Sequence, residues 1–144
     1  MHHEPNHQLL QVSADPALEI IIRTGTQHWQ DGELTLTVRG NGAVEVTQRQ
    51  AAKTASFAGT LPTAELDAFG RALHTHRFTA PRTSELPREP GDTPVMLALH
   101  HDGKVTFAAR IWSADRDTDA DLDAILRAAE RLTHRVSAGK LGQP

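Results

Sequence analysis

The strictest alternation of apolar and polar residues in this chain lies between Glu33 and Gln48. Every second residue is apolar on both sides of a central Gly40-Asn41-Gly42 segment: Leu34, Leu36, Val38, Val44 and Val46. A period of two places alternate side chains on opposite faces of a strand, and a glycine–asparagine segment between two such runs is typical of a hairpin turn. The pattern predicts a β-hairpin with one buried face, on which we expect the rest of the chain to pack.

Shorter runs predict further strands. The run from Ala17 to Thr24 reads as a first strand, and Ile21 on its second face indicates that this face is also partly covered. A weaker run from Thr54 to Ala58 predicts a short strand after the hairpin. A second hairpin is predicted from Val95 to His100 and from Val105 to Trp112, because an Asp-Gly turn dipeptide lies between the two runs.

The last of these strands has an apolar residue at every second position. The residues predicted to face the core are Val105, Phe107, Ala109 and Ile111. Trp112 directly follows Ile111, so we expect it on the opposite face, packed under the last helix.

Two segments have the three- and four-residue spacing of amphipathic helices. The first follows Pro62, with Thr63 as the expected N-cap, and ends near His76. Its apolar face is made of Leu66, Phe69 and Leu73. The second runs to Gly139, with an apolar face made of Leu122, Ile125, Leu126, Ala129, Leu132 and Val136. The arginines near its end and the aspartates at its start suit the helix dipole.

Together these elements predict an α+β fold. We expect a mainly antiparallel sheet of five to six strands with two helices packed on one face, in the order ββ(β)α-ββα. Residues 1–15 are predicted to form a flexible N-terminal arm, residues 16–137 a single α+β domain, and residues 138–144 a frayed C-terminal tail. The proline-rich stretch from Thr79 to Pro94 has no periodicity, and loops of that length are usually functional or disordered.

Composition narrows the class of protein. With 144 residues, 38% hydrophobic and 23% charged, the chain is long and apolar enough for one globular domain. A formal net charge of -3 does not indicate the basic surface that a nucleic-acid-binding protein needs. There is no cysteine, no apolar run long enough to cross a membrane and no secretory signal, so we expect a cytoplasmic location. The residue usage is compatible with a GC-rich bacterial genome.

Clusters of aspartate and histidine are candidates for a divalent metal. Asp115 to Asp123 has acids at every second position, as in a calcium-binding loop, but Ala120 and Leu126 replace the glycine and the bidentate glutamate. A helix start explains the same acids by capping and the dipole. Histidines near the first helix end and the second hairpin turn are a further source of ligands. The candidate metal-binding set is His76, His100, Asp115, Asp117 and Asp119.

No catalytic motif is present: there is no nucleophile elbow, P-loop, dinucleotide-binding G-x-G-x-x-G or H-E-x-x-H. We therefore expect a protein that is not an enzyme and needs no cofactor. Trp29, flanked by His28 in a polar connection, is a candidate interface anchor, although a lid over the sheet edge explains it equally well. Arg82 and Arg88 in the proline-rich loop complete the candidate partner-binding residues.

The order of elements resembles that of a group of small bacterial α+β proteins. The shared features are the first strand, a glycine-containing loop, the hairpin, an F-x-G-x-L motif (Phe57, Gly59 and Leu61), a helix near Glu65, and a last hairpin and helix. The group includes emfourin-type inhibitors of thermolysin-like metalloproteases, and the resemblance spans roughly residues 18–136. Those proteins carry a paired glycine after the first strand, where this chain has only Gly25. The resemblance implies a binding role.

The leading hypothesis is a non-enzymatic protein-binding module of inhibitor or immunity type, which docks a protein partner. The alternative hypothesis is a divalent-metal-binding protein that uses the histidine and aspartate clusters. In one version of this hypothesis, the bound metal supports a hydrolytic activity. A third class is a structural homodimer formed through an uncovered edge or face of the sheet.

Overall fold

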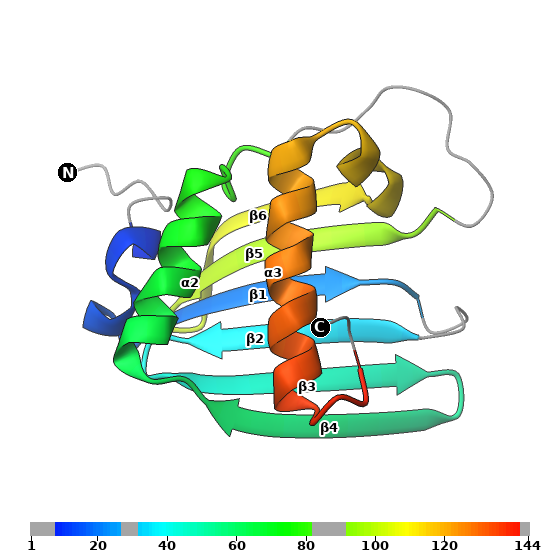
Figure 1. Cartoon of the computed structure of the whole chain (residues 1–144), viewed down its shortest axis with the longest axis horizontal. Coiled ribbons are helices and arrows are strands. Elements are labelled where there is room, and N and C mark those ends of the chain that lie inside the picture. The colour runs from blue at the N-terminus through cyan, green and yellow to red at the C-terminus, as the bar shows by residue number, and fades with distance from the viewer. Residues whose placement is uncertain (1–7, 27–31, 82–91, 142–144) are drawn as a thin grey trace.

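The chain forms one six-stranded antiparallel sheet with helices packed against it (Figure 1). The computed structural model describes residues 8–26, 32–81 and 92–141. The strands are β1 (Leu18–Thr24), β2 (Glu33–Arg39), β3 (Ala43–Gln50), β4 (Lys53–Thr60), β5 (Pro94–His101) and β6 (Lys104–Trp112). Their order across the sheet is β4-β3-β2-β1-β5-β6, with every neighbouring pair antiparallel. The predicted α+β class is confirmed, and β1 shares the centre of the sheet with β2, the first strand of the predicted 33–48 hairpin.

Two α-helices cover one face of the sheet, and Figure 1 shows both in front of the strands. They are α2 (Thr63–Thr75) and α3 (Ala120–Val136), and a 3-10 segment, η2 (Ser113–Asp117), leads into α3. Pro62, not Thr63, takes the N-cap position of α2, and no side chain caps it. Asp119 caps α3, because its carboxylate accepts hydrogen bonds from the N–H groups of Asp121 and Leu122.

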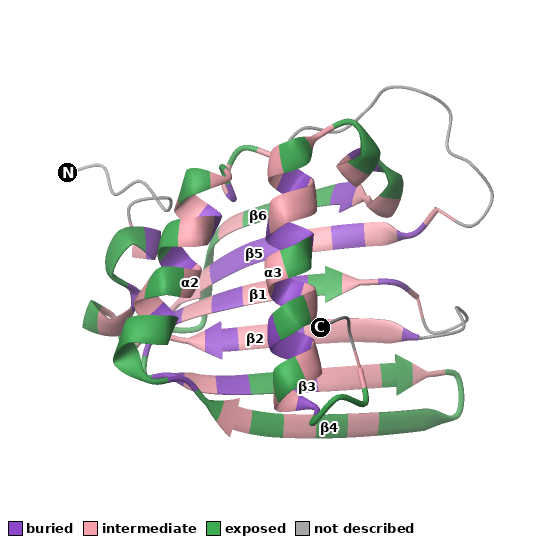
Figure 2. Ribbon diagram, viewed as in Figure 1, coloured by how far each residue is buried: buried purple, intermediate pink, exposed green. Residues whose placement is uncertain are grey.

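The core lies between this helix layer and the sheet. Figure 2 shows buried positions alternating along the strands beneath the helices. The strand residues with the lowest exposure are Leu18, Ile20, Val38, Val44, Val46, Val95, Leu97 and Leu99. Leu66, Leu73, Leu122 and Ile125 of the helices pack against them. The burial confirms the predicted inward faces of the first hairpin and of both helices.

The expected flexible arm over residues 1–15 is wrong for its second half. Leu9–Ala14 forms a 3-10 segment, η1, in which Leu9 and Val12 are fully buried. Ser13 ties it to α2, since both its N–H and its hydroxyl donate to the carboxylate of Asp67, at 2.9 and 2.7 Å. The apolar residues of this short segment, Leu9, Leu10 and Val12, show no helical or strand period, so the sequence did not predict this contact. Residues 1–7 lie outside the described residues.

The start of the predicted frayed tail is also held in place. Ser137 is fully buried, and its hydroxyl oxygen accepts a hydrogen bond of 2.9 Å from the N–H of Leu141. Leu141 in turn packs against the core. The expectation of a tail frayed from residue 138 therefore fails for residues 138–141, and residues 142–144 are outside the described part.

A β-bulge changes the predicted faces of β6. Leu99 is paired with Phe107, but the next residue, His100, is paired with Val105, so Thr106 is an extra residue in β6. One extra residue moves the preceding side chain to the other face. Phe107 and Ile111 thus face the core as predicted, whereas Val105 is 62% exposed.

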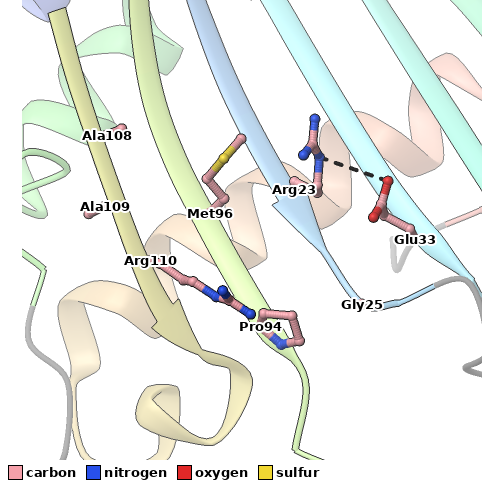
Figure 3. A pocket seen from close by; sticks show the side chains of 8 residues that line it. All are labelled: Arg23, Gly25, Glu33, Pro94, Met96, Ala108, Ala109 and Arg110. Atoms are coloured by element: carbon pink, nitrogen blue, oxygen red, sulfur yellow. Dashed lines mark ion pairs between the residues drawn. The ribbon is translucent and has the colours of Figure 1, made fainter. Parts of the chain in front are cut away.

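We call the sheet face that carries no described helix the open face; Figure 3 views the sheet from this side, with the helices behind it. By strand alternation, β2 and β3 place polar residues on this face: Thr35, Thr37, Arg39, Glu45 and Thr47. On β1, β5 and β6 the open-face residues are more apolar: Ile21, Met96, Ala98, Ala108 and Trp112. Ala98 is only 1% exposed although no described helix covers it. Trp112 lies opposite Ile111 as predicted, but it does not pack under α3, which is on the other face.

Candidate functional site

Three side chains from three strands form a row on the open face. Arg23 of β1 is paired with Met96 of β5, and Met96 is paired with Arg110 of β6. Residues paired across neighbouring strands have their side chains on the same face, one beside the other. Arg23 and Arg110 therefore stand on either side of Met96 in this row, although the three residues are far apart in the sequence.

A pocket of about 460 Å³ lies around this row (Figure 3). Its lining residues are Arg23, Gly25, Glu33, Pro94, Met96, Ala108, Ala109 and Arg110. Gly25, Ala108 and Ala109 are the lining residues with no side chain or a short one. Its volume is within the range of ordinary ligand sites.

Gly25 is required where β1 ends beside the pocket. Its φ is +81°, and a Cβ there would collide with the carbonyl oxygen of Gly32. Only glycine adopts this conformation without strain and permits so close an approach of two chain segments. The sequence therefore leaves this position of the pocket wall without a side chain.

The pocket carries an excess of positive charge. Arg23 lies 3.9 Å from Glu33, measured from Nε to Oε1, and its Nε donates a long hydrogen bond of 3.4 Å to Thr35 Oγ1. Arg110 lies over the ring of Trp112, with 5.8 Å between Cζ and the ring centroid. Within the described ranges, Arg110 has no carboxylate partner. Two guanidinium groups and one carboxylate leave a net charge of about +1.

This arrangement offers groups that can bind an anion. Arginine presents a planar fork of donors that matches a carboxylate or phosphate, and Met96 and Pro94 offer apolar surface beside it. Among the lining residues that the structure describes, Glu33 is the only acid, and none is a histidine, serine, threonine or lysine. The described part of the lining therefore holds no nucleophile beside a base.

The predicted partner-binding residues Trp29, His28, Arg82 and Arg88 all lie outside the described residues. The ends of the two connections that contain them are described. Gly25 precedes one connection and Pro94 follows the other, and both line the pocket. The register pairs Thr24 with Val95, so these two ends are adjacent at one end of the sheet.

The histidines among the candidate metal ligands lie in separate places and contact different residues. His76 ends α2 and lies against the start of α3, with 2.9 Å between its Nδ1 and Asp121 Oδ1, and not against the second hairpin turn. His100 lies on β5, paired with Glu19 of β1. Its neighbour His101 lies 3.1 Å from Asp15, measured from Nε2 to Oδ1.

The aspartates have structural contacts. Asp115 is 2% exposed and accepts a hydrogen bond of 2.9 Å from the N–H of Trp112, and Asp119 caps α3. Asp117 is exposed at the end of η2. Among the described residues, no group of three or more histidine, aspartate or glutamate side chains is placed to hold a metal ion.

One acid of this run belongs to an ion-pair cluster on α3. Hydrogen bonds from Arg127 and Arg116 hold the pKa of Asp123 below its usual value. Burial opposes the charge of Arg116, but its bonds to Asp123 and Glu130 outweigh this and raise its pKa. The cluster joins η2 to α3, so the acidic run has a structural role.

Sequence reasoning did not find Arg23, Met96 and Arg110. One signal was available, since Ile21 on the second face of β1 indicated partial cover of that face. No pattern in the sequence specifies that β5 lies beside β1, and without that pairing the three residues cannot be grouped.

No helix formed by the described residues combines the length and apolar character needed to cross a membrane. In comparisons with known proteins, no protein-family model matches the chain and no curated protein matches its sequence.

Proposed function

We propose that the protein is a non-enzymatic protein-binding module of inhibitor or immunity type, and that its partner docks on the open face around the pocket. The observation that carries the proposal is the row of Arg23, Met96 and Arg110 beside a 460 Å³ pocket. Arginine and methionine are enriched in the core of protein interfaces, where charged residues of other kinds are depleted. Neither α2 nor α3 covers this face.

The apolar character of the open face over β1, β5 and β6 supports the same proposal. An antiparallel sheet with one solvated face normally alternates apolar residues inside with polar residues outside. Here Ile21, Met96 and Trp112 depart from that rule together, and each is only partly exposed. Contiguous apolar surface rimmed by polar residues marks interaction sites on soluble proteins.

The test is affinity capture followed by reconstitution. Immobilised wild type, Arg110→Glu and Arg131→Glu are exposed to an extract of the source organism, and retained proteins are identified. Arg131 is an exposed residue of α3, on the helix layer, and provides the matched charge reversal. We expect a protein retained by wild type and Arg131→Glu and lost with Arg110→Glu. With that protein purified, Arg110→Glu is expected to bind about tenfold or more weakly.

Equal retention of every captured protein by wild type and Arg110→Glu would show that the pocket is not the docking surface. A fourth variant, Trp29→Ala, tests the sequence-based anchor separately. Loss of the partner with Trp29→Ala and not with Arg110→Glu would place the interface at the 25–32 connection and away from the pocket.

A further inference from the structure

We propose that the pocket binds the carboxylate of an acidic side chain, presented by a partner segment that lies across the open face. This inference rests on the proposed function and names the chemistry of the partner. The carboxylate would lie between the guanidinium groups of Arg23 and Arg110, and an apolar neighbour in the segment would rest on Met96.

The spacing of the row suits one carboxylate. Arg23 and Arg110 are separated by the single strand β5, so their Cα atoms are roughly 10 Å apart, which is two strand spacings. Arginine side chains are long enough to reach one group from both sides of such a gap. The residue between them, Met96, is flexible and apolar and adapts to the hydrocarbon part of a ligand.

Both arginines keep donors available. The contacts of Arg23 with Glu33 and Thr35 involve Nε, at 3.9 and 3.4 Å, and the described residues give its two terminal nitrogens no partner. Arg110 lies over the ring of Trp112, a contact that uses none of its N–H groups as hydrogen-bond donors to an oxygen. A carboxylate is the planar acceptor that accepts such donors in pairs.

The charge of the pocket favours a single negative charge. Two guanidinium groups and the carboxylate of Glu33 leave a net charge of one positive charge in the pocket. The carboxylate of one aspartate or glutamate side chain would neutralise this charge. A phosphate group carries nearly two charges at neutral pH and would exceed it. Arg23 and Arg110 are both exposed, so a side chain can reach them from a segment that continues beyond the pocket on either side.

The test is a titration followed by NMR, with ¹⁵N-labelled protein and two isosteric probe peptides, acetyl-Leu-Glu-Leu-amide and acetyl-Leu-Gln-Leu-amide. We expect the glutamate peptide to shift amide signals of β1, β5 and β6 near the pocket, and to bind about five- to tenfold more tightly than the glutamine peptide. Acetyl-leucine, which carries a main-chain carboxylate, and inorganic phosphate are titrated in parallel. Tighter binding of either than of the glutamate peptide would overturn the assignment to an acidic side chain.

Two variants locate the effect. Arg110→Gln is expected to remove the preference for glutamate over glutamine, while Arg131→Gln on α3 keeps it. Equal binding of the two peptides to wild type would refute the inference, as would a preference that survives Arg110→Gln.

The inference and the proposed function fail separately. If the captured partner is lost with Arg110→Glu but the two peptides bind alike, the pocket docks a partner without recognising a carboxylate. If the glutamate peptide binds preferentially but the partner is retained by Arg110→Glu, the carboxylate site exists and the proposed docking face is wrong.

Discussion

The guanidinium of Arg110 lies over the indole ring of Trp112, with 5.8 Å between Cζ and the ring centroid. The two residues are two positions apart on β6, so they share the open face. Figure 3 shows the guanidinium of Arg110 beside Pro94, at the side of the pocket where β5 begins. The ring thus helps to orient the cation that has no carboxylate partner among the described residues.

This contact is expected to matter little for stability. Arg110 is exposed, and a cation–π contact at an exposed site contributes about 0.5–1 kcal/mol. We therefore expect Arg110→Gln to lower the free energy of unfolding by less than about 1 kcal/mol, as measured by urea denaturation. Arg131→Gln serves as the exposed control. A loss well above 2 kcal/mol would give Arg110 a structural role and would make its binding variants uninterpretable.

The bond between Ser13 and Asp67 is expected to depend on pH. The hydroxyl of Ser13, and then its N–H, lower the pKa of Asp67 below its usual value of about 4. A lowered folded-state pKa means that the stabilisation is fully present above the unfolded-state pKa and is lost as pH falls through the folded-state pKa. We expect amides of η1 to lose hydrogen-exchange protection in that acidic range.

In Asp67→Asn, the η1 amides should be less protected already at pH 6, and their protection should change less on acidification. Asp117→Asn, a change at an exposed aspartate of η2, is the control and should behave as wild type. Equal protection of η1 in wild type and Asp67→Asn would contradict the expected role of this contact.

Gly70 of α2 should reverse the usual preference of helices for alanine over glycine. A Cβ at Gly70 would collide with the carbonyl oxygen of Leu9 and with Cγ2 of Val12, so η1 lies directly against the glycine. We expect Gly70→Ala to destabilise the protein by about 1–3 kcal/mol in urea denaturation. Ala68 is exposed on the same helix, where Ala68→Gly should cost about 1 kcal/mol by propensity alone. A stabilised Gly70→Ala variant would mean that η1 does not pack there in solution.

The bulge at Leu99 and His100 predicts different effects for the same substitution at two valines. Val105 is 62% exposed, and Val105→Ala should change the free energy of unfolding by no more than about 0.5 kcal/mol. Val95 is fully buried, and Val95→Ala should cost about 2 kcal/mol through lost burial and the cavity left behind. Similar losses in the two variants would mean that β6 keeps the unbulged register in solution.

Much of the fold could be predicted because its signals are local. In the hairpin from Glu33 to Gln48, the period of two and the glycine turn lie within sixteen consecutive positions of the printed sequence. The apolar face of α3 likewise follows from spacing along one segment. The class, the two helices and their common face were therefore within reach of the sequence.

The candidate site could not be predicted, because its residues come together only through pairing between distant strands. Arg23, Met96 and Arg110 each appear as an unremarkable residue in its own strand. They form a row because β5 is hydrogen-bonded to β1 on one side and to β6 on the other. The bulge that exposes Val105 also depends on pairing with β5, and no alternation within β6 reveals it.

The sequence by itself determined the segments of the six strands and the two α-helices and, apart from the bulged start of β6, their apolar faces, because a side chain's face depends on its position within its own element. The tertiary structure decided that β1 lies between β2 and β5, that Leu9 and Val12 are buried against α2, and that Arg23, Met96 and Arg110 lie in one row across the sheet. These features depend on which elements pair, and pairing is set by the free energy of the whole assembly of strands and helices.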